Sequence, residues 1–170
     1  MKQRLISFVS ALVLACSMIL TSQIDVNAEA AEAQKAKLVD GSYLTMNESS
    51  TGVSQSNSHL RGQFLMDGQS SITRAGSGRI YVYGSTTANT TVDFVSVIIY
   101  VDQYNEEDDV WEQIDAWVED DIDTYYVATS KTLRVDKGYY YRVHCEHFAG
   151  NEEDYPYDCA NSVTNGIWID

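Results

Sequence analysis

Short apolar runs separated by turn residues recur along the chain from about residue 60 onward. The most apolar run covers residues 92–100, and both of its faces are largely apolar, as in a central strand covered on both sides. Residues 110–118 alternate apolar and polar positions, and residues 138–148 form a long aromatic run. About eight such runs, spaced roughly 8–12 residues apart and without a helical period, predict an all-β fold.

The spacing of these runs favours an antiparallel β-sandwich, either immunoglobulin/fibronectin-like or jelly-roll-like. Asp67-Gly68 is the dipeptide that a two-residue type I′ hairpin requires, so a turn is expected there. Gly138, Tyr141 and Val143 are spaced as in the tyrosine corner of immunoglobulin-like domains. The Tyr141 hydroxyl is therefore expected to bond to the backbone upstream of it.

The N-terminus has the three parts of a cleavable export signal. Lys2 and Arg4 precede an apolar stretch over residues 5–20, and small residues follow at Val26-Asn27-Ala28. The apolar stretch is shorter than the roughly 20 residues that cross a bilayer, which disfavours a retained anchor. A lipoprotein signal cleaved at Cys16 is disfavoured because the apolar stretch continues past that residue. A secreted or cell-surface protein is predicted, with membrane contact only through the signal peptide before cleavage.

The sequence divides into three predicted segments. Residues 1–28 are the predicted signal peptide, and residues 59–170 are the predicted β-sandwich domain, long enough to bury a core. Residues 29–58 contain few large apolar side chains and cannot offset their ordering entropy by burial, so a flexible leader is predicted.

The formal net charge of −14 limits the classes of binding partner that are expected. Nucleic acids and anionic membranes select basic surfaces, so no nucleic-acid partner is expected. Catalysis is not predicted either, because the chain has no Gly-x-Ser-x-Gly motif and only three histidines, His59, His144 and His147. A small hydrolase that uses a carboxylate pair remains an alternative, since acidic residues are abundant.

Two cysteines remain after signal cleavage, Cys145 and Cys159. In an exported protein such a pair predicts a disulfide. Two free thiols, or a zinc site completed by His147, are the alternatives.

No cofactor is predicted except calcium, for which two acidic runs provide hard oxygen ligands. The candidate ligands are Asp102, Asn105, Asp108, Asp120, Asp121 and Asp123. Neither run has the EF-hand spacing, and solvated acidic turns are the alternative interpretation.

The aromatic residues provide the main functional hypothesis. Trp111 and Trp117 alternate with polar residues, opposite the apolar positions 114, 116 and 118. On a strand they would lie on one outer face, roughly 20 Å apart, where they could contact an extended ligand. Tyr140 and Arg142 would likewise share a face with His144 and Glu146. These side chains predict a surface for an extracellular glycan or protein, although aromatic residues are also ordinary core material.

Five segments of the chain carry a resemblance to a known family: Asp40-Gly41-Ser42-Tyr43-Leu44, Leu65-Met66-Asp67-Gly68, residues 79–89, residues 100–105 and residues 138–144. They are similar to DUF 6147, a family of small secreted proteins from Gram-positive gut bacteria. The resemblance implies export and a self-contained domain, and it implies no activity. The expected function is therefore an exported, non-catalytic binding or structural module.

Overall fold

The computed structural model describes residues 36–54 and 63–170. The strands are β1 (Leu38–Val39), β2 (Ser42–Thr45), β3 (Ser49–Val53), β4 (Leu65–Arg74), β5 (Arg79–Asn105), β6 (Val110–Arg134), β7 (Tyr139–Gly150), β8 (Asp158–Val163) and β9 (Gly166–Ile169), with one 3-10 turn, η1 (Glu152–Asp154). No α-helix occurs among these residues, and so none that could cross a membrane. The all-β prediction is confirmed. The predicted signal peptide, residues 1–28, lies outside the described residues.

The strands of the described chain form one nine-stranded sheet, in the order β1-β2-β9-β7-β5-β4-β3, with β6 added beside β5 and β8 beside β7. β2 pairs with β9 in parallel, whereas the other pairs are antiparallel. The prediction of a purely antiparallel sheet is therefore wrong. A parallel pair needs a long connection, and here almost the entire domain lies between β2 and β9.

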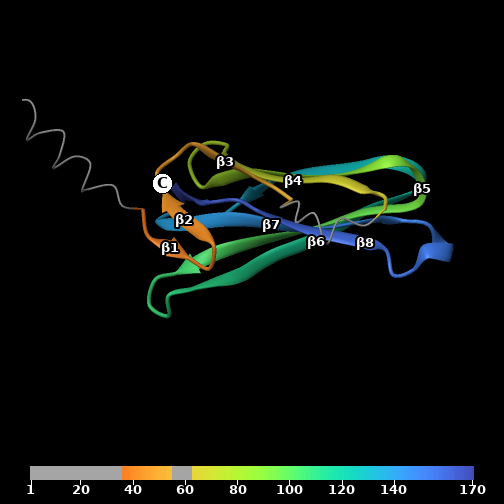
Figure 1. The fold of residues 1–170 in the computed structure, drawn as a ribbon. Helices are drawn as coiled ribbons and strands as arrows, with labels where there is room; N and C mark the ends of the chain where they lie inside the picture. Colours follow the sequence, from red (N-terminus) through yellow and green to blue (C-terminus); the bar gives the residue numbers. More distant parts are fainter. Residues whose placement is uncertain (1–35, 55–62) are drawn as a thin grey trace, which may run out of the picture. The chain divides into compact units, whose positions relative to one another are not determined.

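The β5–β6 hairpin organises the sheet. Its strands are 27 and 25 residues long and pair along most of their length, but the pairing skips from Thr87 to Val92 on β5. Before this skip β5 also pairs with β4, and after it with β7. The hairpin bends at the skip, so that it has an upper arm beside β4 and a lower arm beside β7 (Figure 1). The sheet thus curls over itself.

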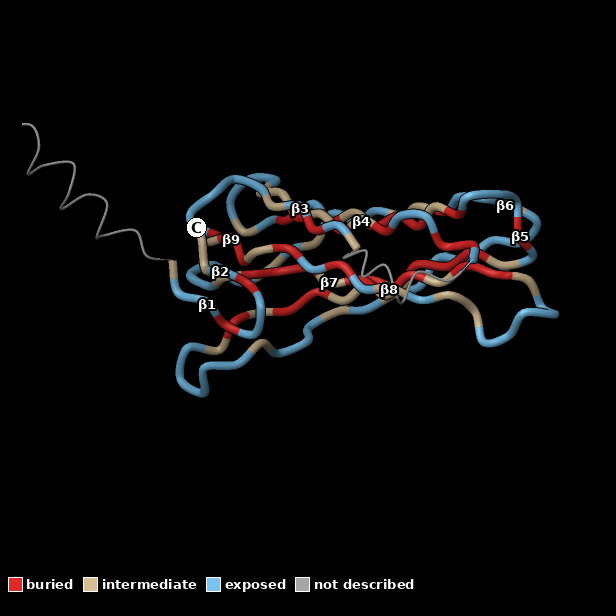
Figure 2. The backbone as a smooth tube through the Cα atoms, in the orientation of Figure 1, coloured by how far each residue is buried: buried red, intermediate tan, exposed pale blue. Residues whose placement is uncertain are grey.

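The hydrophobic core lies between the two arms (Figure 2). It includes Ile72, Ile80 and Val82 from the upper side and Val95, Val97, Ile99, Val101 and Val143 from the lower side, all with no exposed surface. The central position predicted for residues 92–100 is confirmed, because β5 lies between β6 and β7 from Phe94 onward. Full cover on both sides is not found, since Phe94, Ile98 and Tyr100 on the other face are only partly buried. We call the face of the lower arm, β7 and β8 that is turned away from this core the outer face.

The turn predicted at Asp67-Gly68 is instead strand, and so is the turn-like segment over residues 84–89. Asp67-Gly68 lies inside β4. A glycine is needed at position 68 because the backbone passes directly over the imidazole ring of His147, and a Cβ would overlap that ring. Residues 84–89 lie inside β5, where Ser85, Thr86 and Ala88 are buried between the arms. Both segments have turn-like composition, but glycine and small polar residues are also what close approach of two backbones requires.

The prediction of a flexible leader over residues 29–58 is wrong for residues 38–53, which form β1, β2 and β3. These strands bury little apolar surface and are held mainly by backbone pairing and polar contacts. β3 also approaches β8 closely, since a Cβ on Gly52 would overlap the Val163 carbonyl. Low hydrophobicity therefore does not indicate disorder in this segment.

The predicted tyrosine-corner hydrogen bond is present. The Tyr141 side chain is fully buried at the start of β7, and its hydroxyl donates to the Asp136 carbonyl at 2.8 Å. The same hydroxyl lies 3.3 Å from the Gln103 side-chain oxygen. Burial raises the pKa of Tyr141 to about 12, so the hydroxyl remains a donor.

We expect Tyr141→Phe to lower the free energy of unfolding by about 1 kcal/mol, because the Asp136 carbonyl loses its donor while the ring stays packed. Urea unfolding monitored by circular dichroism measures the change. Tyr139→Phe, which alters an exposed hydroxyl two residues earlier, is the matched control and should leave the stability nearly unchanged. Equal losses in both variants would contradict a structural role for the Tyr141 bond.

Candidate functional site

A β-bulge in β6 places the two tryptophans on opposite faces of the sheet. Val101 of β5 pairs with Asp115 and the next residue, Asp102, pairs with Gln113, so Ile114 is the extra residue. Trp111 pairs with Tyr104 on the outer face, whereas Trp117 pairs with Ile99 and packs against the core. The prediction of a two-tryptophan outer surface is therefore wrong, because a bulge shifts the alternation by one residue.

The side chains around Trp117 confirm this reversal. The Lys131 ammonium group lies 4.1 Å from the centre of the Trp117 ring, which is a cation–π contact between the two arms of β6. The apolar positions Ile114, Ala116 and Val118, predicted to face the core, are exposed instead.

Arg142 is the centre of a buried polar cluster on the outer face. Its Nε donates to the Asp102 carboxylate at 2.9 Å, and its terminal nitrogens donate to the Asp40 carbonyl, the Asp40 carboxylate and the Ser42 hydroxyl. The guanidinium lies 4.6 Å from the centre of the Trp111 ring, whose Nε1 donates to the Val39 carbonyl at 3.0 Å. Arg142 and Trp111 therefore hold the β1–β2 turn against the sheet.

Asp102 is the anion at the centre of this cluster. The same oxygen that accepts from Arg142 also accepts from His144 Nδ1 at 3.0 Å. Burial alone would raise the pKa of Asp102, but the hydrogen bonds from His144 and Arg142 outweigh it and lower the pKa. The carboxylate is thus charged, and the arginine and histidine are its partners.

Next to the cluster, Tyr100 stacks on the His144 ring with the ring centres 4.6 Å apart, and its hydroxyl lies 3.4 Å from the Glu146 carboxylate. Burial and the charge of Glu146 raise the pKa of Tyr100. Tyr140 packs edge-on against Trp168, 5.0 Å between centres. Among the four predicted ligand residues, Trp111, Tyr140 and Arg142 share the outer face, and each contacts other side chains of the domain.

The candidate calcium ligands are spread along the hairpin. Asp102 is occupied by Arg142 and His144, and the Asn105 side-chain amide donates to the Asp108 carboxylate at 3.1 Å. Asp120 pairs with Ser96, six residues along β5 from Asp102 and thus roughly 20 Å away. Across residues 36–54 and 63–170, no three acidic, histidine or cysteine side chains are grouped so as to hold a metal ion.

Cys145 and Cys159 are both free thiols, so the predicted disulfide is wrong. Cys145 is buried on the core side of β7, and Cys159 is exposed beside Phe148, on the other face. Two cysteines on opposite faces of one sheet cannot bring their sulfur atoms within bonding distance. Burial raises the pKa of Cys145 to about 12, which makes its thiol unreactive.

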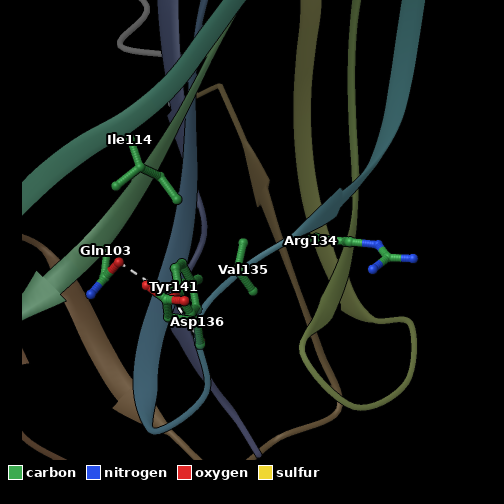
Figure 3. A pocket seen from close by; sticks show the side chains of 6 residues that line it. All are labelled: Gln103, Ile114, Arg134, Val135, Asp136 and Tyr141. Carbon is green, nitrogen blue, oxygen red and sulfur yellow. Dashed lines mark hydrogen bonds between the residues drawn. The ribbon is translucent and has the colours of Figure 1, made fainter.

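A shallow pocket of about 370 Å³ opens where the loop from β6 to β7 meets the lower arm (Figure 3). It is lined by Gln103, Ile114, Arg134, Val135, Asp136 and Tyr141. Figure 3 shows the Arg134 side chain pointing away from Tyr141. Asp136 is the one carboxylate in this lining, so the pocket does not provide the facing carboxylate pair that a glycoside hydrolase requires.

The most unusual surface of the described chain is the lower arm of β6, residues 110–124, which pairs with β5 and with no other strand of that part of the chain. Val118 is 53% exposed and Ile122 is 67% exposed. The same segment contains six acidic residues, Glu112, Asp115, Glu119, Asp120, Asp121 and Asp123. The alternation of apolar and polar residues predicted that the apolar side chains face the core. The acidic residues between them were the feature of the sequence that indicated an exposed edge strand.

The chain belongs to a family of unknown function, DUF6147, whose model matches residues 42–166. The matched segment begins in β2 and ends at the start of β9, so it includes Arg142, Asp102 and the whole β5–β6 hairpin. No curated protein and no solved structure matches the chain.

Proposed function

We propose that this chain is an exported, non-catalytic binding module that contacts an extracellular protein through the lower arm of β6. The observation that carries the proposal is a long strand edge without a partner in the described chain, flanked by exposed apolar side chains. Soluble proteins normally shorten, cover or block such edges because they recruit other strands. An edge that no other strand covers over many residues is a surface suited to binding another chain.

The protein partner is favoured over a glycan by where the tryptophans lie. A polysaccharide surface needs flat aromatic rings on one exposed face, but Trp111 contacts Arg142 and Trp117 packs on the opposite face beneath Lys131. A glycan is the second candidate. It is supported by the stacked rings of Tyr100 and His144 on the outer face, which lie beside the Glu146 carboxylate.

The scaffold that we propose is an immunoglobulin-like sandwich, in which the two arms of the curled sheet act as its two layers. The buried residues between the arms and the Tyr141 hydrogen bond support it. The stiff scaffold would hold the edge of β6 in place for a partner.

The proposal is tested by selecting short random peptides on the immobilised mature chain and measuring their affinity for a Val118→Pro variant. Proline removes one edge donor and adds a ring that blocks a neighbouring strand, so affinity should fall at least about tenfold. Val118→Ala, which keeps the backbone donor, is the matched control and should retain most of the affinity.

Circular dichroism should confirm that Val118→Pro remains folded. Peptides that bind Val118→Pro as well as the unmodified chain would place the binding surface elsewhere. Failure to select any peptide would contradict a protein-binding role.

A further inference from the structure

The backbone of β6 between residues 115 and 122 has hydrogen-bond donors directed away from β5. The Ala116 N–H donates to the Asp115 carboxylate at 2.8 Å, and the Ile122 N–H donates to the Asp121 carboxylate at 2.8 Å. In an antiparallel ladder, alternate residues turn their N–H and C=O groups to the same side. The pairing with β5 is uninterrupted from 115 to 122, so Val118 and residue 120 present their backbone groups to the same open edge.

The side chains of this segment alternate in chemistry as well as in direction. Ala116, Val118 and Ile122 pair with Tyr100, Ile98 and Phe94 and so lie on the outer face, together with Asp120. Asp115, Glu119 and Asp121 pair with Val101, Val97 and Val95 and so lie on the inner side. A mainly apolar row and an acidic row therefore flank one edge, and the inner row is interrupted by Trp117 with Lys131 over it.

We infer that the partner of this edge is an extended segment in which apolar and basic residues alternate. This inference rests on the proposed function, since it names the chemistry of the partner at that same edge. A strand added beside β6 would place its own alternate side chains next to the two rows. Cross-strand neighbours stabilise a sheet when apolar meets apolar and when charges are opposite. Lysine or arginine on the inner side, and valine, isoleucine or tyrosine on the outer side, satisfy both rows.

A second copy of the chain does not satisfy them. Two β6 strands side by side would place Asp115, Glu119 and Asp121 against the same acidic row of the other copy, and like charges directly opposite are destabilising. The net charge of −14 adds repulsion between the two molecules. The acidic row thus selects against self-association and in favour of a cationic strand.

The test uses capped peptides of alternating lysine and valine, with a control peptide that contains the same residues in two blocks. We expect the alternating peptide to bind at least about tenfold more tightly than the block peptide, and to slow hydrogen exchange at the amides of Val118 and residue 120. Binding should weaken as salt is added, because the contacts are between exposed charges. A peptide of alternating glutamate and valine should not bind.

Charge reversal provides the matched variant. In Glu119→Lys/Asp121→Lys the preference should invert, with the glutamate–valine peptide now the tighter ligand. Absence of binding by the lysine–valine peptide, or equal binding of the block peptide, overturns the inference. If peptides selected from a random library still bind at β6 in that case, the proposed function stands and only the partner chemistry fails. If no peptide protects β6, both fail.

Discussion

Replacement of Arg142 by alanine is expected to lower the free energy of unfolding by about 3–5 kcal/mol, because it leaves a charged carboxylate buried without its cation. The side chains of Arg142 and Asp102 are only 8% and 4% exposed. The substitution also removes the donors to Asp40 and Ser42 that hold the β1–β2 turn. Chemical denaturation at neutral pH, with hydrogen exchange at Ser42 as a local readout, measures both effects.

A double-mutant cycle separates the charge from the lost packing. Asp102→Asn removes the charge that Arg142 neutralises, so Arg142→Ala should cost less stability in that background than in the unmodified chain. Arg79→Ala, which truncates an exposed arginine on the upper arm, is the control and should change stability by less than about 0.5 kcal/mol. An Arg142→Ala variant as stable as Arg79→Ala would contradict the importance of the cluster.

The apolar pattern predicted the strands of this fold well where burial determines structure. The core of β5 over residues 92–100 and the start of β7 were both predictable, because their side chains must leave water whatever the topology. The strand over the polar residues 84–89 could not be predicted from the apolar pattern. These residues are buried because the β5–β6 hairpin bends and pairs with segments distant in the sequence. The strands at residues 38–53 were missed for a related reason, because distant residues hold the turn between β1 and β2. Arg142 bonds to Asp40 from 102 residues further along the chain, and Trp111 bonds to Val39 from 72 residues further along.

The candidate site was predictable only in part because period-two alternation fails at a bulge. The residues of β7 alternate regularly, so Tyr140, Arg142, His144 and Glu146 do share the outer face. In β6 the extra residue Ile114 reverses the assignment from that point on. A sequence pattern shows the acids and the apolar residues, but it does not show which strand lies at an edge, because that depends on the order of the whole sheet.

The second large effect concerns His147, whose imidazole is fully buried between the arms. The Thr86 hydroxyl donates to the Ser96 carbonyl at 2.8 Å, so its oxygen accepts from His147 Nδ1 at 2.9 Å. The Nε2 atom therefore carries the lone pair and accepts from the Ser162 hydroxyl at 2.8 Å. Gly68 packs on the ring, which leaves no space for water to solvate a charge.

Burial lowers the pKa of His147 to about 4, from an ordinary value of 6.5. Between these two pH values the unfolded chain binds a proton that the folded chain does not, so stability is full above pH 6.5 and falls as the pH drops toward 4. The expected loss is about 3 kcal/mol, complete below the folded-state pKa. Unfolding free energies measured by urea denaturation between pH 7 and pH 4 should show it.

His147→Gln isolates this effect, because glutamine fills a similar volume with polar groups but does not titrate. The carboxylates titrate in both proteins, so the difference between the two stability curves belongs to the histidine. The variant should be less stable than the unmodified chain at pH 7, where its hydrogen bonds are imperfect, and the gap should narrow by about 3 kcal/mol toward pH 4. Parallel curves would mean that the imidazole accepts a proton while folded, and that the contacts of Thr86, Ser162 and Gly68 do not keep it neutral.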